Sequence, residues 1–165
     1  MKKLTVTAED CTGCRRCEQA CIAAHSRAGN AALATLEKPE PKSRILIEYD
    51  RGPVPLVCRH CVEPLCVSAC MAGCMQKDPE TGIVNNVGHE QQCVGCWMCI
   101  MACPYGVISP SYDAGGEDQS SFAVALKCDL CPNLDTPACV AACPMNVLAV
   151  SDVPEPVFNA KGNVP

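Results

Sequence analysis

Short stretches in which apolar and polar side chains alternate recur along the chain and predict β-strands. None is longer than six residues, and Gly52 with Pro53 is expected to end the second. The predicted strands are residues 2–7, 44–49, 83–87, 122–126 and 147–150, with 107–108 as a further short strand. A helix is predicted over residues 18–25, before Gly29 and Asn30. The pattern predicts an α+β fold of small strands and short helices.

Two polar stretches carry no such pattern. Residues 109–121 are rich in Ser, Gly, Asp and Glu, and we expect a surface loop there. Residues 151–165 hold three prolines and are expected to form an extended C-terminal tail.

Cysteine is unusually frequent, at 17 of the 165 residues, which is typical of a scaffold built on cysteine. The hydrophobic share of 48% includes these cysteines, and aromatic residues make up only 4%. We therefore expect a core too small to stabilise the fold alone, so that bound metal or disulfides must contribute.

The sequence carries no apolar segment long enough to span a membrane. Its basic start runs into Glu9 and Asp10 instead of into the apolar core of a secretory signal. We expect a cytoplasmic protein, and the reducing cytoplasm disfavours disulfides. The formal net charge of −5 argues against nucleic acid as a partner.

Sixteen of the cysteines form four groups of four. The third group has the spacing C-x2-C-x2-C-x3-C-P that holds [4Fe–4S] clusters in bacterial ferredoxins, and Gly95 permits the sharp turn between its first two cysteines. The first group keeps this spacing without the proline, whereas the second and fourth have longer gaps before the third cysteine. The groups are Cys11, Cys14, Cys17 and Cys21; Cys58, Cys61, Cys66 and Cys70; Cys93, Cys96, Cys99 and Cys103; and Cys128, Cys131, Cys139 and Cys143.

Zinc is the alternative metal, because paired CxxC elements also build four-cysteine zinc sites. Each group here is a triplet plus one cysteine, two groups end in Cys-Pro, and no paired-histidine element follows any of them. These features favour four [4Fe–4S] clusters, with a zinc-structured binding scaffold as the remote alternative.

The fourth cysteine of each group is expected on a short helix that carries it away from the first three. In two-cluster ferredoxins this cysteine ligates the other cluster. The second and third groups resemble one complete two-cluster ferredoxin, and the first and fourth would form another around it. The expected ligand sets are Cys11, Cys14, Cys17 and Cys143 for cluster 1; Cys58, Cys61, Cys66 and Cys103 for cluster 2; Cys93, Cys96, Cys99 and Cys70 for cluster 3; and Cys128, Cys131, Cys139 and Cys21 for cluster 4. The corresponding domains are an outer dicluster ferredoxin-like module at residues 1–55 and 111–150, and an inserted one at 56–110.

The order and spacing of the groups resemble the electron-transfer subunits of dimethyl sulfoxide reductase, formate dehydrogenase and formate hydrogenlyase, over about residues 3–150. Within that group, the segments Cys58–Cys61, Lys77–Gly82 and Cys93–Cys99 look most like the ferredoxin-like subunit of anaerobic carbon monoxide dehydrogenase. The chain departs from the family at Met71, where proline is usual, and at Cys74, where a small residue that is not a ligand is expected.

The resemblance implies a pseudo-twofold fold with four clusters in a row. Such a protein passes single electrons between a catalytic subunit and an acceptor protein such as a hydrogenase or a flavin oxidoreductase. Carbon monoxide dehydrogenase is the expected catalytic subunit, and a tungsten or molybdenum enzyme such as aldehyde oxidoreductase is the alternative. The sequence shows no Ser/His/Asp set, phosphate loop or nucleotide fingerprint, so the chain itself is not expected to be an enzyme.

Four residues inside the ligand loops could influence the clusters. Trp97 is expected to pack over a cluster and exclude water, with a partner contact as the alternative. His60 is expected to lie on the surface or to bond the backbone, although a donor near sulfur would raise a cluster's potential. Arg15 and Arg16 either balance the charge of an anionic cluster or form a docking patch, and the sequence leaves both roles open.

Three further residues are less directly tied to the ligand loops. His25 and His89 are expected on the polar surface. Cys74 is the cysteine left over from the four groups. It lies four residues after Cys70 and beside the apolar Met75, so we expect a buried thiol that binds no metal.

Overall fold

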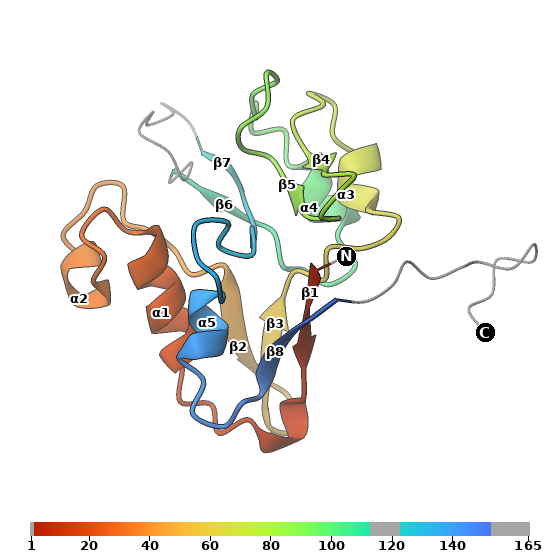
Figure 1. Ribbon diagram of the computed structural model, residues 1–165. Helices are drawn as coiled ribbons and strands as arrows, with labels where there is room; N and C mark the ends of the chain where they lie inside the picture. The colour runs from red at the N-terminus through yellow and green to blue at the C-terminus, as the bar shows by residue number, and fades with distance from the viewer. Residues whose placement is uncertain (1, 113–122, 153–165) are drawn as a thin grey trace, which may run out of the picture.

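The computed structural model describes residues 2–112 and 123–152, and the strands within these ranges form four two-stranded antiparallel sheets (Figure 1). The pairs are β1 with β8, β2 with β3, β4 with β5 and β6 with β7. The strands are β1 Lys2–Val6, β2 Ile45–Tyr49, β3 Pro53–Val57, β4 Gln76–Lys77, β5 Val84–Asn85, β6 Ser109–Ser111, β7 Val124–Leu126 and β8 Leu148–Asp152. The helices are α1 Arg16–His25, α2 Ala31–Ala34, α3 Leu65–Ser68, α4 Met98–Ala102 and α5 Ala138–Ala141, with a 3-10 turn η1 at Ala8–Asp10.

The elements divide between two halves (Figure 1). The lower half in this view contains the β1–β8 and β2–β3 sheets with α1, α2 and α5, and the upper half contains β4 to β7 with α3 and α4. Each half has its own buried apolar cluster: Leu4, Ile45 and Leu148 belong to the first, and Met75 and Val84 to the second. Five of the eleven buried members of the first cluster are cysteines, so sulfur fills much of the space where a larger aliphatic core would lie.

The predicted mixture of short strands and helices is confirmed. The strands expected at residues 2–7, 44–49 and 147–150 correspond to β1, β2 and β8. The strand expected at 83–87 shortens to β5, and the one expected at 122–126 corresponds to β7, with Phe122 outside the described residues. Of the expected tail, residues 151–152 belong to β8, and residues 153–165 lie outside the described part.

The strand prediction was incomplete in one place and wrong in another. The second predicted strand ends at Tyr49, before Gly52, as expected, but Pro53–Val57 then forms β3, which was not predicted, in register with β2 through Tyr49↔Pro53 and Ile47↔Pro55. Proline cannot donate to a sheet, and β3 tolerates it because this sheet has only two strands, so each strand keeps an open edge. Residues 107–108 form no strand, whereas the next three residues, expected in a loop, form β6.

Helix α1 confirms the predicted helix and begins two residues earlier than expected. The sequence analysis missed the other helices because each has only four or five residues, too few to show a helical period. Asn30 begins α2, since its side chain accepts hydrogen bonds from the backbone N–H groups of Ala32 and Leu33. None of the helices in the described ranges has the length and apolar character that a membrane crossing needs.

Substitution within β2 can test whether the lower core stabilises the molecule. Ile45 is 1% exposed and its neighbour Leu46 is 40% exposed. We expect Ile45→Ala to lower the free energy of unfolding by about 3 kcal/mol, because it leaves a cavity, and the matched Leu46→Ala to change it by about 0.5 kcal/mol or less. Anaerobic guanidinium unfolding followed by circular dichroism measures both. Equal losses in the two variants would contradict this account of the core.

Candidate metal centres

The four cysteine groups open with the same backbone turn. In each, the residue just before the second cysteine has a left-handed conformation: φ is 68° at Gly13, 44° at His60, 67° at Gly95 and 61° at Leu130. Glycine adopts this conformation freely, but His and Leu do so at a cost in strain. The groups therefore share one local structure despite their different spacings.

The third and fourth cysteines of each group lie in or beside a short helix. The third cysteines are inside the helices: Cys17 in α1, Cys66 in α3, Cys99 in α4 and Cys139 in α5. The expectation that the fourth cysteine is also helical is correct only for Cys21, because the other three helices end before their fourth cysteine. These three cysteines are followed by a common left-handed turn, in which the third residue after the cysteine donates its N–H to the cysteine carbonyl. The N–H to O pairs are Gly73 to Cys70 at 3.2 Å, Gly106 to Cys103 at 3.3 Å and Asn146 to Cys143 at 3.4 Å.

A pocket brings together cysteines from the two ends of the chain. Its lining includes Cys11, Cys14 and Cys17 from the first group and Cys143 from the fourth. The strand β8 contributes Leu148 to the same pocket. These four cysteines are the set expected for cluster 1.

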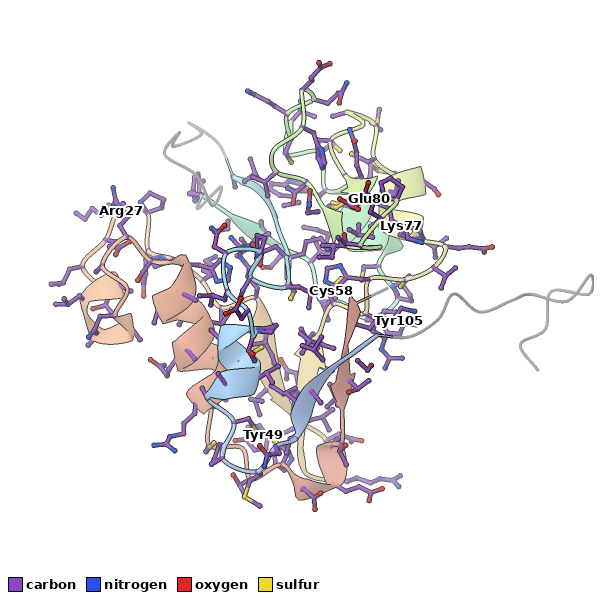
Figure 2. The ribbon with its side chains drawn as sticks, viewed as in Figure 1. Arg27, Tyr49, Cys58, Lys77, Glu80 and Tyr105 are labelled. Carbon is purple, nitrogen blue, oxygen red and sulfur yellow. The ribbon has the colours of Figure 1, made fainter. Side chains whose placement is uncertain are left out.

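Cys58 of the second expected set lies between the two halves of the molecule (Figure 2). Burial raises the pKa of Cys61, and the neighbouring thiols of Cys58 and Cys103 raise it further. Burial also raises the pKa of Cys66, and Cys58, Cys103 and Cys61 raise it further by smaller amounts. The charge of Cys103, the last cysteine of the third group, therefore influences two cysteines of the second group.

In the remaining two expected sets, cysteines of different groups also influence one another's pKa. Burial raises the pKa of Cys99 to about 11, and the largest charge effects come from Cys93 of its own group and Cys70 of the second group. Burial raises the pKa of Cys139 to about 12, again with contributions from two other cysteines. These two are Cys21 of the first group and Cys131 of its own group.

The chemistry of these sulfur atoms suits soft metal ions. At the depth of Cys17, Cys99 and Cys139, burial keeps thiols protonated, and a thiolate becomes stable there only with positive charge beside it. Backbone N–H groups already point at five sulfur atoms and favour their thiolate form. The N–H to Sγ pairs are Arg44 to Cys21 at 3.2 Å, His60 to Cys58 at 3.5 Å, Met75 to Cys70 at 3.4 Å, Ala125 to Cys93 at 3.5 Å and Leu130 to Cys128 at 3.4 Å. The residues present therefore fit thiolate-bound iron–sulfur clusters.

An ion-pair network that the sequence analysis missed surrounds Cys21. Arg44 is buried and its Nη1 donates to Asp129 Oδ2, while Asp129 Oδ1 lies 3.2 Å from His25 Nε2 and accepts the N–H of Cys131 at 3.0 Å. Despite its burial, Asp129 has a pKa below its usual range, because His25 and Arg44 stabilise the carboxylate. The three members come from three separate segments, so no local pattern could have shown the network.

His25 was wrongly expected on the polar surface. Burial alone would lower its pKa, but the hydrogen bonds with Asp129 and Cys21 outweigh it and raise the pKa to about 9. Its Nδ1 donates to the Cys21 carbonyl at 2.8 Å. Ligand atoms of His25, Asp129 and Cys131 lie within 4.8 Å of one another. Because Arg44 and His25 already neutralise the carboxylate, we interpret this group as an ion pair beside the cysteines and not as a separate metal site.

His60 and Lys127 lie between the second and fourth groups. His60 is 0% exposed, and its Nδ1 accepts the N–H of Val84 at 2.9 Å, so of its two expected roles it has the backbone-bonded one. Burial and the charge of Lys127 lower the pKa of His60 to about 3. The buried Lys127 Nζ donates to the carbonyls of Val84 and Cys128. The sequence analysis passed over Lys127, for which the only signal was its place beside a cysteine group.

Trp97, Arg15 and Arg16 occupy the segments after the second cysteine of their groups. Trp97 is half-buried and Arg15 is exposed, and both have left-handed φ values, 64° and 56°, at the residue that begins a helix. The Arg15 guanidinium lies 5.8 Å from the centre of the Tyr49 ring. Arg16 is exposed. The roles expected for these three residues stay predictions.

Cys74 is 2% exposed, which confirms that it is buried. Its Sγ lies 3.5 Å from Cys70 Sγ, and burial, followed by the contact with Cys70, raises its pKa to about 12. It is therefore a protonated thiol beside a predicted ligand. That it binds no metal stays a prediction.

Comparison with known proteins identifies the class. The family described as "4Fe-4S dicluster domain" matches residues 51–153, which is more than half of the chain. The electron transport protein HydN of Escherichia coli K12 is 35% identical over 153 residues, covering 88% of this chain and 85% of HydN. An iron-sulfur protein of Rhodospirillum rubrum is 34% identical over 155 residues, covering 88% and 79%.

The chain therefore belongs to the 4Fe-4S dicluster domain family, a ferredoxin-like class of iron–sulfur proteins. Among solved structures, a chain of the BamBC active-site complex of benzoyl coenzyme A reductase, with 1,5-dienoyl-CoA, is 24% identical. The match covers 97% of this chain and 82% of that chain, with a TM-score of 0.46. We base no argument on this weaker likeness.

The ion pair beside Cys21 gives a stability prediction. Asp129→Ala should lower the free energy of unfolding by about 3 kcal/mol, because it leaves the buried Arg44 guanidinium without its partner. Asp135→Ala, an exposed aspartate in the same cysteine group, should change it by about 0.5 kcal/mol or less. Anaerobic urea unfolding measures both variants. Indistinguishable midpoints would show that the ion pair does not stabilise the fold.

Proposed function

We propose that this chain is an electron-transfer protein that holds four [4Fe–4S] clusters and is not itself an enzyme. The observation that carries the proposal is that cysteines of different groups are brought together, as at the pocket shared by Cys11, Cys14, Cys17 and Cys143. The proposed ligand sets are the four expected from the sequence. When bound, each cluster supplies a centre that accepts and releases one electron. Relatives named as an electron transport protein and an iron-sulfur protein support the same function.

Electrostatic effects between cysteines of different sets support a linear order. Cys17 contributes to the raised pKa of Cys139, which relates set 1 to set 4. Cys58 contributes to the raised pKa of Cys128, which relates set 4 to set 2. Cys66 contributes to the raised pKa of Cys99, which relates set 2 to set 3. We therefore propose the order 1, 4, 2, 3.

Exposure of the cysteines supports a role for the two ends of this order. Among the seventeen cysteines, only Cys14 of set 1 and Cys96 of set 3 are exposed. A partner can therefore come close to a cysteine at sets 1 and 3, whereas no cysteine of sets 4 and 2 is exposed. We propose that a catalytic subunit docks at one end and an acceptor protein at the other. On the resemblance of the cysteine loops, the catalytic subunit is of the carbon monoxide dehydrogenase type.

The two halves support the expected pair of modules. Each contains a two-stranded sheet, a pair of packed helices and a β-hairpin: β1–β8, α1 with α5, and β2–β3 in one; β4–β5, α3 with α4, and β6–β7 in the other. We propose that these are two dicluster modules with pseudo-twofold symmetry. The burial of Ala125 with Met75 and Val84 supports extending the proposed inserted module from residue 110 to residue 126.

Metal analysis tests the number of clusters. We expect about sixteen iron atoms per chain, four for each cubane cluster, in protein purified without oxygen. The visible spectrum should show the broad absorption of iron–sulfur proteins. Half that iron accompanied by stoichiometric zinc would refute the proposal in favour of a partly zinc-structured scaffold.

Paired cysteine substitutions test the exchange of ligands. Cys103→Ser and Cys61→Ser should perturb the same EPR signal of the reduced protein, and Cys96→Ser a different one, because Cys103 is proposed to serve set 2. Cys74→Ala is the matched control and should keep all four clusters, since this thiol is assigned to no set. If Cys103→Ser and Cys96→Ser perturbed one common signal, each group would serve its own cluster and the exchange would be wrong.

A further inference from the structure

Buried side-chain nitrogen atoms without a hydrogen-bond partner are rare in folded proteins. In the described ranges, only three buried side-chain polar atoms lack a partner, and two of them are nitrogen atoms: His60 Nε2 and Arg44 Nε. Each belongs to a residue beside a proposed ligand set. Burying such a group without a partner is unfavourable, so each requires an acceptor that the described residues do not supply.

The hydrogen-bond pattern defines His60 as a donor. Val84 donates its N–H to Nδ1, so Nδ1 carries no proton, and the ring proton of the neutral imidazole lies on Nε2. The neighbouring Lys127 cannot accept that proton, because its amino group is itself a donor to the Val84 and Cys128 carbonyls. His60 stands between Cys58 and Cys61, and its own N–H lies 3.5 Å from Cys58 Sγ. Sulfur of a cluster on this set would supply the missing acceptor.

Arg44 repeats the arrangement at set 4. Its side chain is 4% exposed, its Nη1 is engaged by Asp129, and its backbone N–H donates to Cys21 Sγ at 3.2 Å. The Nε–H group remains without an acceptor among the described residues. The unsatisfied donors thus lie at the two sets that occupy the middle of the proposed order.

We propose that His60 Nε2 and Arg44 Nε donate hydrogen bonds to sulfur atoms of the two central clusters and hold the potentials of these clusters above the values they would otherwise have. This inference rests on the proposed function, since it needs clusters on sets 2 and 4. A reduced cluster carries one more negative charge than an oxidised one, so a fixed N–H donor stabilises the reduced form more. His60 and Arg44 are positioning residues in this role and exchange no electron themselves.

Leucine is a suitable replacement for His60. The fourth group carries Leu130 at the same place before its second cysteine, with φ 61°, so this backbone turn accommodates leucine. In an anaerobic redox titration followed by EPR, His60→Leu should lower the potential of one of four couples. We expect a change of about tenfold in its reduction equilibrium, which is about 59 mV for one electron. His60→Gln, which keeps an N–H donor, should show a smaller shift.

Matched variants make the result specific. His89 lies in the same half and bonds only Asn85 within the described residues, so His89→Leu should leave all four potentials unchanged. Arg44→Lys keeps the positive charge but removes the Nε donor, and it should lower a different couple from the one shifted by His60→Leu. Unshifted potentials in both His60→Leu and Arg44→Lys, with all four clusters present, would overturn the inference while leaving the proposed function intact.

The unsubstituted protein offers an independent readout. When histidine is labelled with ¹⁵N, pulsed EPR of the reduced protein should detect a weak coupling to a histidine nitrogen that disappears in His60→Gln, whereas any coupling from His25, whose Nδ1 lies 3.7 Å from Cys21 Sγ, should remain in that variant. A spectrum without such coupling, in protein with a full iron content, would assign the acceptor of His60 to buried water and overturn the inference. A wild-type iron content below four clusters would instead refute the proposed function first.

Discussion

The buried cysteines must serve both as small apolar groups in the core and as possible metal ligands. At the depth of Cys128 or Cys139 a thiol packs as a small apolar group, and burial strongly raises its pKa. The same sulfur becomes a ligand only as a thiolate, which the core tolerates only next to positive charge. The lower core, in which β1, β2 and β8 pack around these cysteines, can therefore hold their sulfur as protonated thiols or as metal-bound thiolates, but not as free thiolates.

Buried cationic groups belong to the same electrostatic problem. Lys127 and Arg44 would be costly in a core without anions, and the protein anions near them cover only part of the charge. Asp129 balances Arg44, while the amino group of Lys127 is satisfied by carbonyl oxygens and by no carboxylate among its described contacts. Lys127 therefore places uncompensated positive charge between the second and fourth cysteine groups, where anionic clusters would balance it.

The sequence allowed some of these features to be predicted, and the reasons can be given residue by residue. Cysteine spacing reveals the groups because it is a local property of the sequence. Gly13 and Gly95 indicate the turns in their groups because glycine is common at positive φ. His60 and Leu130 adopt the same turn without any such signal. Strand β3 was not predicted because it contains two prolines, which are unusual in strands. The ion pair of Arg44 with Asp129 was not predicted because it joins segments that only the fold brings together. Long-range contacts of this kind leave no periodic trace in a sequence.

The pairing of β1 with β8 has a consequence for how the chain is made. Strand β1 finds its only described sheet partner in β8, so the lower half stays open until residues 148–152 have been synthesised. The elements of the upper half, by contrast, all come from residues 65–126 and can associate earlier. Assembly during translation therefore proceeds from the middle of the sequence outwards, and the N-terminal cysteines wait longest, exposed to oxidants, for the residues that enclose them.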